Sequence, residues 1–260
     1  MSEDPWMSLK PLTAARIALG RCGGSLPTRE VLDFAAAHAR ARDAVWSEFD
    51  MHGLATRLCE AGQTVLCIES SCRTRAEYLQ RPDLGREISN LTRDLIRHMG
   101  QNQGPFDLAV VVSDGLSALA PQRHVFPVLS KLLPRLEENG WRLSQTIIVR
   151  WGRVAVADEV GELLGAQLSL ILLGERPGLG APDSLGAYLT FAPRRGRTDA
   201  ERNCVSNIRP EGLTPDDAAA TLHYLLSEAR RRRISGVALK DERRVAPRLE
   251  CGAGSELSLE

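Results

Sequence analysis

Three short and almost wholly apolar runs in the second half of this 260-residue chain place the strongest constraint on its fold. They span residues 108–112, 146–149 and 168–173, and each is followed within three residues by a glycine. Segments with helical spacing of apolar residues separate them. Strands that are apolar on both faces and alternate with helices are typical of a parallel sheet covered on both sides. We therefore expect an α/β fold with a mostly parallel sheet flanked by helices.

The spacing of apolar residues divides the chain into three parts. Residues 1–103 have mainly helical spacing and are expected to form a helical N-terminal region. Residues 104–240 contain the three apolar runs and are expected to form the α/β domain. Residues 241–260 show no period and are expected to be a loose C-terminal tail.

Local signals place further elements within these parts. A helix is expected over 28–49, and the apolar run 65–68 fits a strand. Asp83 is suited to cap a helix that runs on through Gly100. A fourth strand is expected over 186–191, and Thr214 with the proline after it predicts the start of a last helix.

Charge and composition exclude several classes of protein. Lys plus Arg and Asp plus Glu both number 33, so the net charge is zero and a polyanion such as nucleic acid is not an expected partner. No run of 18 apolar residues predicts a membrane span, and the N-terminus lacks a secretory signal. Six scattered cysteines fit reduced thiols in a cytoplasmic protein. Neutrality also gives little protection against association, which fits a chain bound to another protein.

The loops that follow the apolar runs are the candidate binding region. They span 113–117, 151–154 and 174–180, and the carboxyl ends of parallel strands meet at one edge of a sheet, where ligands bind. Asp114 and Glu175 place carboxylates there that could accept hydrogen bonds from a ligand. The same two acids could equally form turns or helix caps.

Several specific chemistries find no support in the sequence. The glycine-rich loop 174–180 lacks the lysine of a phosphate-binding loop, and no G-x-G-x-x-G opens a helix. No group of residues has metal-ligand spacing, and no Ser/His/Asp pattern stands out. Cys204 has no histidine nearby in sequence to activate it. The residues alone therefore indicate a ligand-binding α/β protein, and we expect no catalytic residue and no protein metal ligand.

Seven short sequence motifs, spread in order over about residues 6–240, resemble those of the small (light) subunit family of ethanolamine ammonia-lyase. They are TAARIALGR (13–21), LPT (26–28), HARARD (38–43), RPDLGR (81–86), SDGLS (113–117), GERPG (174–178) and CVSNI (204–208). Each motif alone is weak evidence for the family, whereas the ordered set of seven is specific to it. The resemblance implies a Rossmann-like α/β domain over 104–240 that contacts cobalamin.

The resemblance also implies a partner and a cofactor. The family works with a large TIM-barrel subunit, possibly six copies of each, and the large subunit holds ethanolamine. Adenosylcobalamin binds at the subunit interface and enables radical conversion of ethanolamine to acetaldehyde and ammonia. The family's cofactor contacts fall here on Val154, Glu175 and Cys204.

Loop position alone adds three weaker candidates to those cofactor contacts: Ser113, Asp114 and Arg153. The chain lacks the Asp-x-His-x-x-Gly motif of modules in which a protein histidine binds cobalt, so the resemblance implies no metal ligand here.

Two other functions stay open beside the lyase. The chain could be a non-catalytic adaptor of the large subunit, or a self-contained Rossmann-like enzyme that binds a nucleotide. Some family members carry a long N-terminal extension linked to packaging in a bacterial microcompartment. The matching motifs begin close to Met1 here, so we expect free cytoplasm in preference to a microcompartment.

Overall fold

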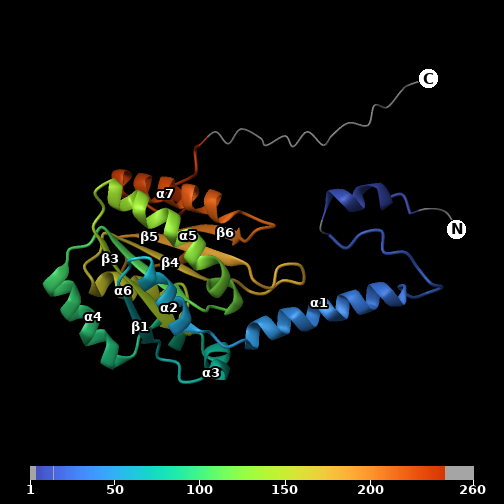
Figure 1. Ribbon diagram of the computed structural model, residues 1–260, viewed down its shortest axis with the longest axis horizontal. Helices are drawn as coiled ribbons and strands as arrows, with labels where there is room; N and C mark the ends of the chain where they lie inside the picture. Colours follow the sequence, from blue (N-terminus) through green and yellow to red (C-terminus); the bar gives the residue numbers. More distant parts are fainter. Residues whose placement is uncertain (1–3, 14, 244–260) are drawn as a thin grey trace.

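A single six-stranded sheet forms the centre of the computed structural model, which describes residues 4–13 and 15–243 (Figure 1). The strand order is β1-β3-β2-β4-β5-β6. The strands are β1 (Val65–Glu69), β2 (Leu108–Ser113), β3 (Leu143–Arg150), β4 (Leu168–Gly174), β5 (Leu185–Phe191) and β6 (Arg202–Ile208). Strands β1 to β4 are parallel to one another, while β5 runs antiparallel to both β4 and β6. The expected mostly parallel α/β sheet is confirmed.

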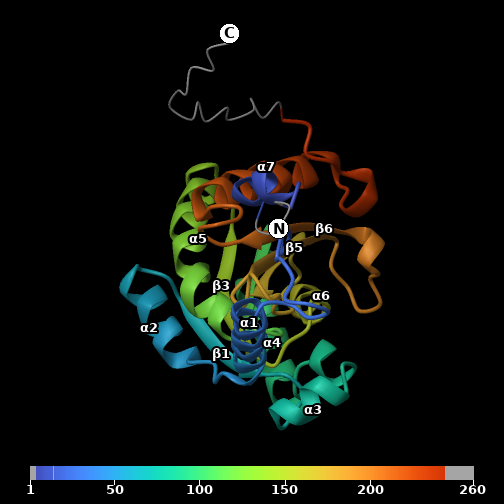
Figure 2. The same ribbon diagram turned by 90° about the vertical axis from the view of Figure 1, so that its right-hand side faces the viewer.

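Seven α-helices accompany the sheet in the described residues. They are α1 (Thr28–Trp46), α2 (Met51–Glu60), α3 (Arg75–Gln80), α4 (Asn90–Gln103), α5 (Leu119–Glu138), α6 (Val156–Leu163) and α7 (Pro215–Arg232). Helices α2, α5 and α7 bury one face of the sheet, and α4 and α6 bury the other (Figure 2). In β2, Val110 and Val112 point to the first face, whereas Ala109 and Val111 point to the second. This explains why β2 is apolar throughout.

The connections of β2 and β3 open a crevice between these neighbouring strands. The chain leaves β2 toward α5 on one face and leaves β3 toward α6 on the opposite face. Such a switch between adjacent parallel strands is where open α/β sheets bind ligands. The fold thus places the loops after β2, β3 and β4 around one crevice.

The sheet takes its edge strand β1 from within residues 1–103. The expected strand at 65–68 is confirmed, and it pairs with β3 from Val65–Thr146 to Glu69–Arg150. The sheet therefore extends beyond the segment 104–240. Residues 244–260, most of the expected tail, lie outside the described residues.

Two local expectations were wrong. Asp83 precedes only a three-residue 3₁₀ helix, Leu84–Arg86, and its side chain does not cap it but forms an ion pair with Arg81; α4 begins only at Asn90. The helix starts later than expected because Ile88 forms an isolated β-bridge with Ser70. Its N–H also donates a hydrogen bond to Glu159 Oε2 at 3.0 Å. The second error concerns the segment around Cys204, where no strand was expected and β6 forms.

Helix α1 projects away from the body of the protein, and the N-terminal segment folds back above it (Figure 1). Only Ala37 and Ala44 of this 19-residue helix are buried. We call residues 4–46 without residue 14 the N-terminal arm. No helix in the described part of the chain is long and apolar enough to span a bilayer.

Candidate functional site

Asp114 joins the loops after β2 and β3. It follows β2, is 2% exposed, and its Oδ1 accepts a hydrogen bond from the N–H of Trp151 at 2.6 Å. Its Oδ2 accepts from Arg75 Nη1 at 3.0 Å. Burial raises the pKa of this carboxyl group, and the Arg75 charge opposes the rise. Asp114 is therefore a buried link to Arg75 and Trp151, which lie far from it in the sequence, and these two contacts are neither a helix cap nor a local turn.

A close backbone contact fixes the loops after β2 and β4 against each other. Gly115 has a φ of +56°, and a Cβ placed there would lie 2.2 Å from the carbonyl oxygen of Gly174. A Cβ on Gly174 would in turn lie 2.0 Å from the carbonyl oxygen of Ser117. At Gly115 both the left-handed conformation and the close approach exclude a side chain, and at Gly174 the close approach excludes it.

A pocket of about 430 Å³ opens where these loops meet. We call it the strand-end pocket. It is lined by Tyr78, Leu116, Arg153, Val154, Leu173, Gly174, Glu175, Arg176 and Tyr188. Apolar and aromatic surface with a few polar groups is the usual composition of a site for a cofactor or small molecule.

Arg153 and Val154 form one wall of the strand-end pocket at the start of α6. The Arg153 guanidinium stacks on the Tyr78 ring, 4.2 Å from its centroid, and Nη2 donates to the Tyr78 carbonyl oxygen at 3.0 Å. Tyr78 is fully buried, and burial raises the pKa of its hydroxyl. Arg153 Nε is buried and has no hydrogen-bond partner in the described residues. Val154 packs beside these groups against the core under α6.

Glu175 forms the opposite wall, and its carboxylate reaches across the start of β5 to β6. Oε1 accepts a hydrogen bond from Ser206 Oγ at 2.5 Å. Oε2 accepts from Ser184 Oγ at 2.5 Å and from the N–H of Asn207 at 3.2 Å. A carboxylate offers about four lone-pair positions, so about one is left for a ligand. Glu175 therefore uses most of its hydrogen-bonding capacity within the protein and has little left for a ligand.

Cys204 adjoins the strand-end pocket through Tyr188. The two residues are register partners on β6 and β5, so their side chains lie next to each other on one face of the sheet. Cys204 is exposed, but nearby atoms still displace part of the water around the thiol, and this chiefly raises its pKa; the Glu175 charge adds to the rise. A thiol with a raised pKa is a poor nucleophile at neutral pH.

The structure thus brings together most of the residues expected from the sequence. Val154, Glu175 and Arg153 line one pocket, and Cys204 contacts its Tyr188 wall. Ser113 and Asp114 are buried and do not line it. Binding of a cofactor by these residues stays a prediction. In the described residues, no group of three His, Cys, Asp or Glu side chains could hold a metal ion.

Two tyrosines of the strand-end pocket were missed by the sequence analysis. Tyr188 is the one tyrosine in the run 185–191, where Thr190 is the only other polar side chain, and this was a usable signal. Tyr78 lies on the six-residue helix α3, too short for its apolar spacing to be recognised.

Comparison with known proteins decides the family. The family model described as ethanolamine ammonia-lyase light chain (EutC) matches residues 3–240. The chain belongs to the ethanolamine ammonia-lyase light chain family. This membership covers the N-terminal arm, the whole sheet and every residue of the strand-end pocket.

Curated relatives of this light chain family agree over nearly their full lengths. The small subunit of ethanolamine ammonia-lyase from Azotobacter vinelandii is 56% identical over 255 residues, which is 98% of this chain and 94% of that protein. The small subunit from Pseudomonas fluorescens Pf-5 is 55% identical over 245 residues, 94% of this chain and 89% of that protein. The resemblance found in the sequence motifs is confirmed, and the chain is a subunit of a lyase.

Proposed function

We propose that this light chain helps to bind adenosylcobalamin at an interface with the large subunit of ethanolamine ammonia-lyase. Val154 and Glu175 would contact the cofactor directly, and Cys204 would contact it beside Tyr188. The observation that carries the proposal is that Val154 and Glu175 line one pocket and Cys204 lies beside it. Val154 comes from the loop after β3, Glu175 from the loop after β4 and Cys204 from β6.

The residues of the strand-end pocket fit a corrin ring with amide side chains. Val154, Leu116 and Leu173 offer apolar surface for the ring. Arg153 Nε is a buried donor without a partner, which suits an amide or other oxygen acceptor. Glu175 retains about one acceptor position for an amide N–H or a hydroxyl group.

Bound adenosylcobalamin supplies the radical chemistry that converts ethanolamine to acetaldehyde and ammonia. The residues of this chain bind and orient the cofactor and exclude water from one side of it. Asp114 and Gly115 hold the loops in place behind the strand-end pocket. The raised pKa of Cys204 keeps its thiol protonated beside the pocket. Ethanolamine itself would be held by the large subunit.

Exposed apolar residues on the N-terminal arm support the proposal that the chain binds a large protein partner. Apolar side chains stand exposed along it, including Leu32 at 63% and Val31 and Phe34 at 48% and 49%. A contiguous exposed apolar surface marks a protein interaction site. Its helix α1 ends beside the carboxyl edge of the sheet, where Arg75 Nε donates to the Val45 carbonyl oxygen at 2.9 Å. The arm could therefore anchor the partner next to the strand-end pocket.

The test is co-expression with the large subunit, followed by an assay of acetaldehyde release with and without adenosylcobalamin. We expect activity only when both chains and the cofactor are present. Activity of this chain alone would overturn the proposal, as would full activity of the large subunit alone. A complex that forms but binds cobalamin equally well with Val154→Asp would favour the adaptor alternative.

The arm is tested by measuring the affinity of the Leu32→Asp variant for the large subunit. We expect it to weaken association with the large subunit by about ten-fold, since truncated or charged anchor residues cost this much at interfaces. Leu91→Asp is the matched control, because Leu91 is 91% exposed on α4 outside the arm. Equal association of both variants with the large subunit would remove the arm from the interface.

A further inference from the structure

A second pocket shares a wall with the strand-end pocket and is rich in arginine. Its volume is about 440 Å³. We call it the arginine pocket; it is lined by Pro82, Arg86, Arg153, Val154, Ala155, Arg197, Thr198, Asp199 and Arg202. Arg153 and Val154 line both pockets. A ligand seated in the strand-end pocket could therefore extend into the arginine pocket past these two residues.

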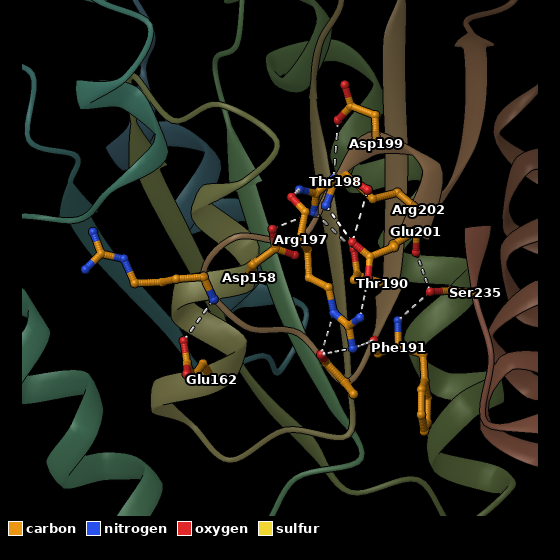
Figure 3. Close-up of polar contacts among 12 residues, drawn as sticks. Asp158, Glu162, Thr190, Phe191, Arg197, Thr198, Asp199, Glu201, Arg202 and Ser235 are labelled. Carbon is orange, nitrogen blue, oxygen red and sulfur yellow. Dashed lines mark hydrogen bonds and ion pairs between the residues drawn. The ribbon is translucent and has the colours of Figure 1, made fainter. Parts of the chain in front are cut away.

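Two of the four arginines carry charge that no acid in the described residues neutralises. Arg202 pairs with Asp158 at 2.5 Å and with Asp199, the one acid that lines the pocket, at 3.5 Å (Figure 3). Arg197 pairs with Glu201. Arg86 and Arg153 form no ion pair among the described residues. The arginine pocket therefore has an excess of positive charge, which favours an anion.

Buried hydrogen-bond donors in this pocket also lack acceptors. The Arg202 side chain is 4% exposed, and its Nε has no hydrogen-bond partner in the described residues. Nε forms an ion pair with Asp199 Oδ1 at 3.5 Å but no hydrogen bond, and the Asp199 side chain is fully exposed. Arg153 Nε is a second buried donor of this kind. Buried donors are normally satisfied, so these two point to an acceptor that the chain itself does not supply.

The start of helix α6 faces the same pocket. Val154 and Ala155 line it, and Ala155 is the N-cap of this eight-residue helix. The backbone N–H groups of Val154 and Ala155 donate to no described residue. Free N–H groups and the positive end of the helix dipole together bind phosphate and similar anions.

Resting on the proposed function, we propose that the arginine pocket holds the phosphate ester of the ligand whose body fills the strand-end pocket. In cobalamin this group is the phosphodiester of the nucleotide tail. Arg86 and the two backbone N–H groups would bind its oxygens, and Arg153 would contact the ligand in both pockets. Planar guanidinium groups are suited to paired hydrogen bonds with phosphate oxygens.

The primary test measures equilibrium affinity of the two-subunit complex for adenosylcobalamin and for cobinamide, which lacks the phosphodiester and nucleotide. Arg86→Gln should weaken adenosylcobalamin binding about ten-fold, the loss typical of one charge-assisted hydrogen bond, and leave cobinamide binding unchanged. Arg86→Lys should recover part of the affinity. Arg232→Gln, on an exposed arginine at the end of α7, is the matched control.

The outcomes separate this inference from the proposed function. A wild-type complex that binds neither cobalamin nor cobinamide would overturn the proposed function. A complex that binds both, with Arg86→Gln changing both affinities equally or neither, would overturn the phosphate site alone. Titration with inorganic phosphate distinguishes the source of the anion: we expect weak binding that saturating adenosylcobalamin abolishes. Phosphate binding that persists beside bound adenosylcobalamin would overturn the assignment to the cofactor's phosphodiester.

Discussion

The carboxylate of Glu175, directly after β4, accepts a hydrogen bond from the hydroxyl of Ser206 on β6 at 2.5 Å, although β5 lies between the two strands. The crossing is possible because residue 186 is glycine: a Cβ there would lie 2.9 Å from Glu175 Oε1. The side chain that the family resemblance predicts to contact the cofactor therefore also holds β6, with Cys204, beside the strand-end pocket.

The hydrogen bond between Glu175 and Ser206 predicts that Glu175→Ala has two effects. It removes an acceptor of three hydrogen bonds, so the free energy of unfolding should fall by about 1–3 kcal/mol. In the complex with the large subunit, adenosylcobalamin affinity should fall about ten-fold, because the wall and one acceptor are lost together. Urea unfolding measures the first effect and spectroscopic titration the second.

Ser206→Ala separates the hydrogen bond between Glu175 and β6 from the proposed contact of Glu175 with the cofactor. It breaks one hydrogen bond of Glu175 and leaves the carboxylate, so the loss of cofactor affinity should be smaller, about three-fold. Ser130→Ala is the control, since Ser130 Oγ donates only to the Pro127 carbonyl oxygen on α5. Unchanged cofactor affinity in Glu175→Ala would refute the role of this residue in binding.

Gly115→Ala should destabilise the fold more than another glycine of the same conformation. Gly115 and Gly165 have φ values of +56° and +63°, but only at Gly115 would the added Cβ meet backbone, 2.2 Å from the Gly174 carbonyl oxygen. Left-handed backbone alone costs about 1–2 kcal/mol for a non-glycine residue, which is our expectation for Gly165→Ala. Gly115→Ala should lose about 3 kcal/mol or more. Equal losses in urea unfolding would contradict the close contact.

The sheet was predictable where both of its faces are buried. Residues of β2 and β4 are buried at every position, so their sequences are apolar runs that only a covered strand explains. Strand β6 lies at the edge of the sheet and mixes buried with exposed positions, among them Ser206 and Asn207. Its polar sequence carries no strand signal, and only pairing with β5 makes it a strand.

Only those site residues that directly follow strands were predictable from the sequence. Glu175 and Arg153 follow apolar runs, so the rule for parallel sheets located them. Their partners come from distant segments: Arg153 contacts Tyr78, and Glu175 contacts Ser206. No spacing in the sequence encodes such contacts, because they arise when helix α3 and strand β6 pack against the finished sheet.

The loop before β6 should lose stability in acid. The N–H of Thr198 donates to Glu201 Oε2 at 2.8 Å and Arg197 pairs with Oε1, which lowers the pKa of Glu201 from 4.5 to about 2 (Figure 3). A lowered acid pKa stabilises the fold above the unfolded value, and that contribution disappears as the pH falls from about 4.5 toward 2. Glu201→Gln should therefore be less stable than wild type at pH 6, with a smaller difference at pH 3.5. A difference in urea unfolding that does not change with pH would contradict this.

The thiol of Cys204 should respond in opposite directions to changes in its two neighbours. The Glu175 charge raises its pKa and the Tyr188 hydrogen bond lowers it. Because the thiolate is the reactive form, Glu175→Gln should speed alkylation of Cys204 by iodoacetamide at pH 8, and Tyr188→Phe should slow it. Mass spectrometry resolves Cys204 from Cys22, an exposed cysteine on the N-terminal arm whose rate should not change. Faster alkylation in both variants would mean that access, and not the pKa, controls this thiol.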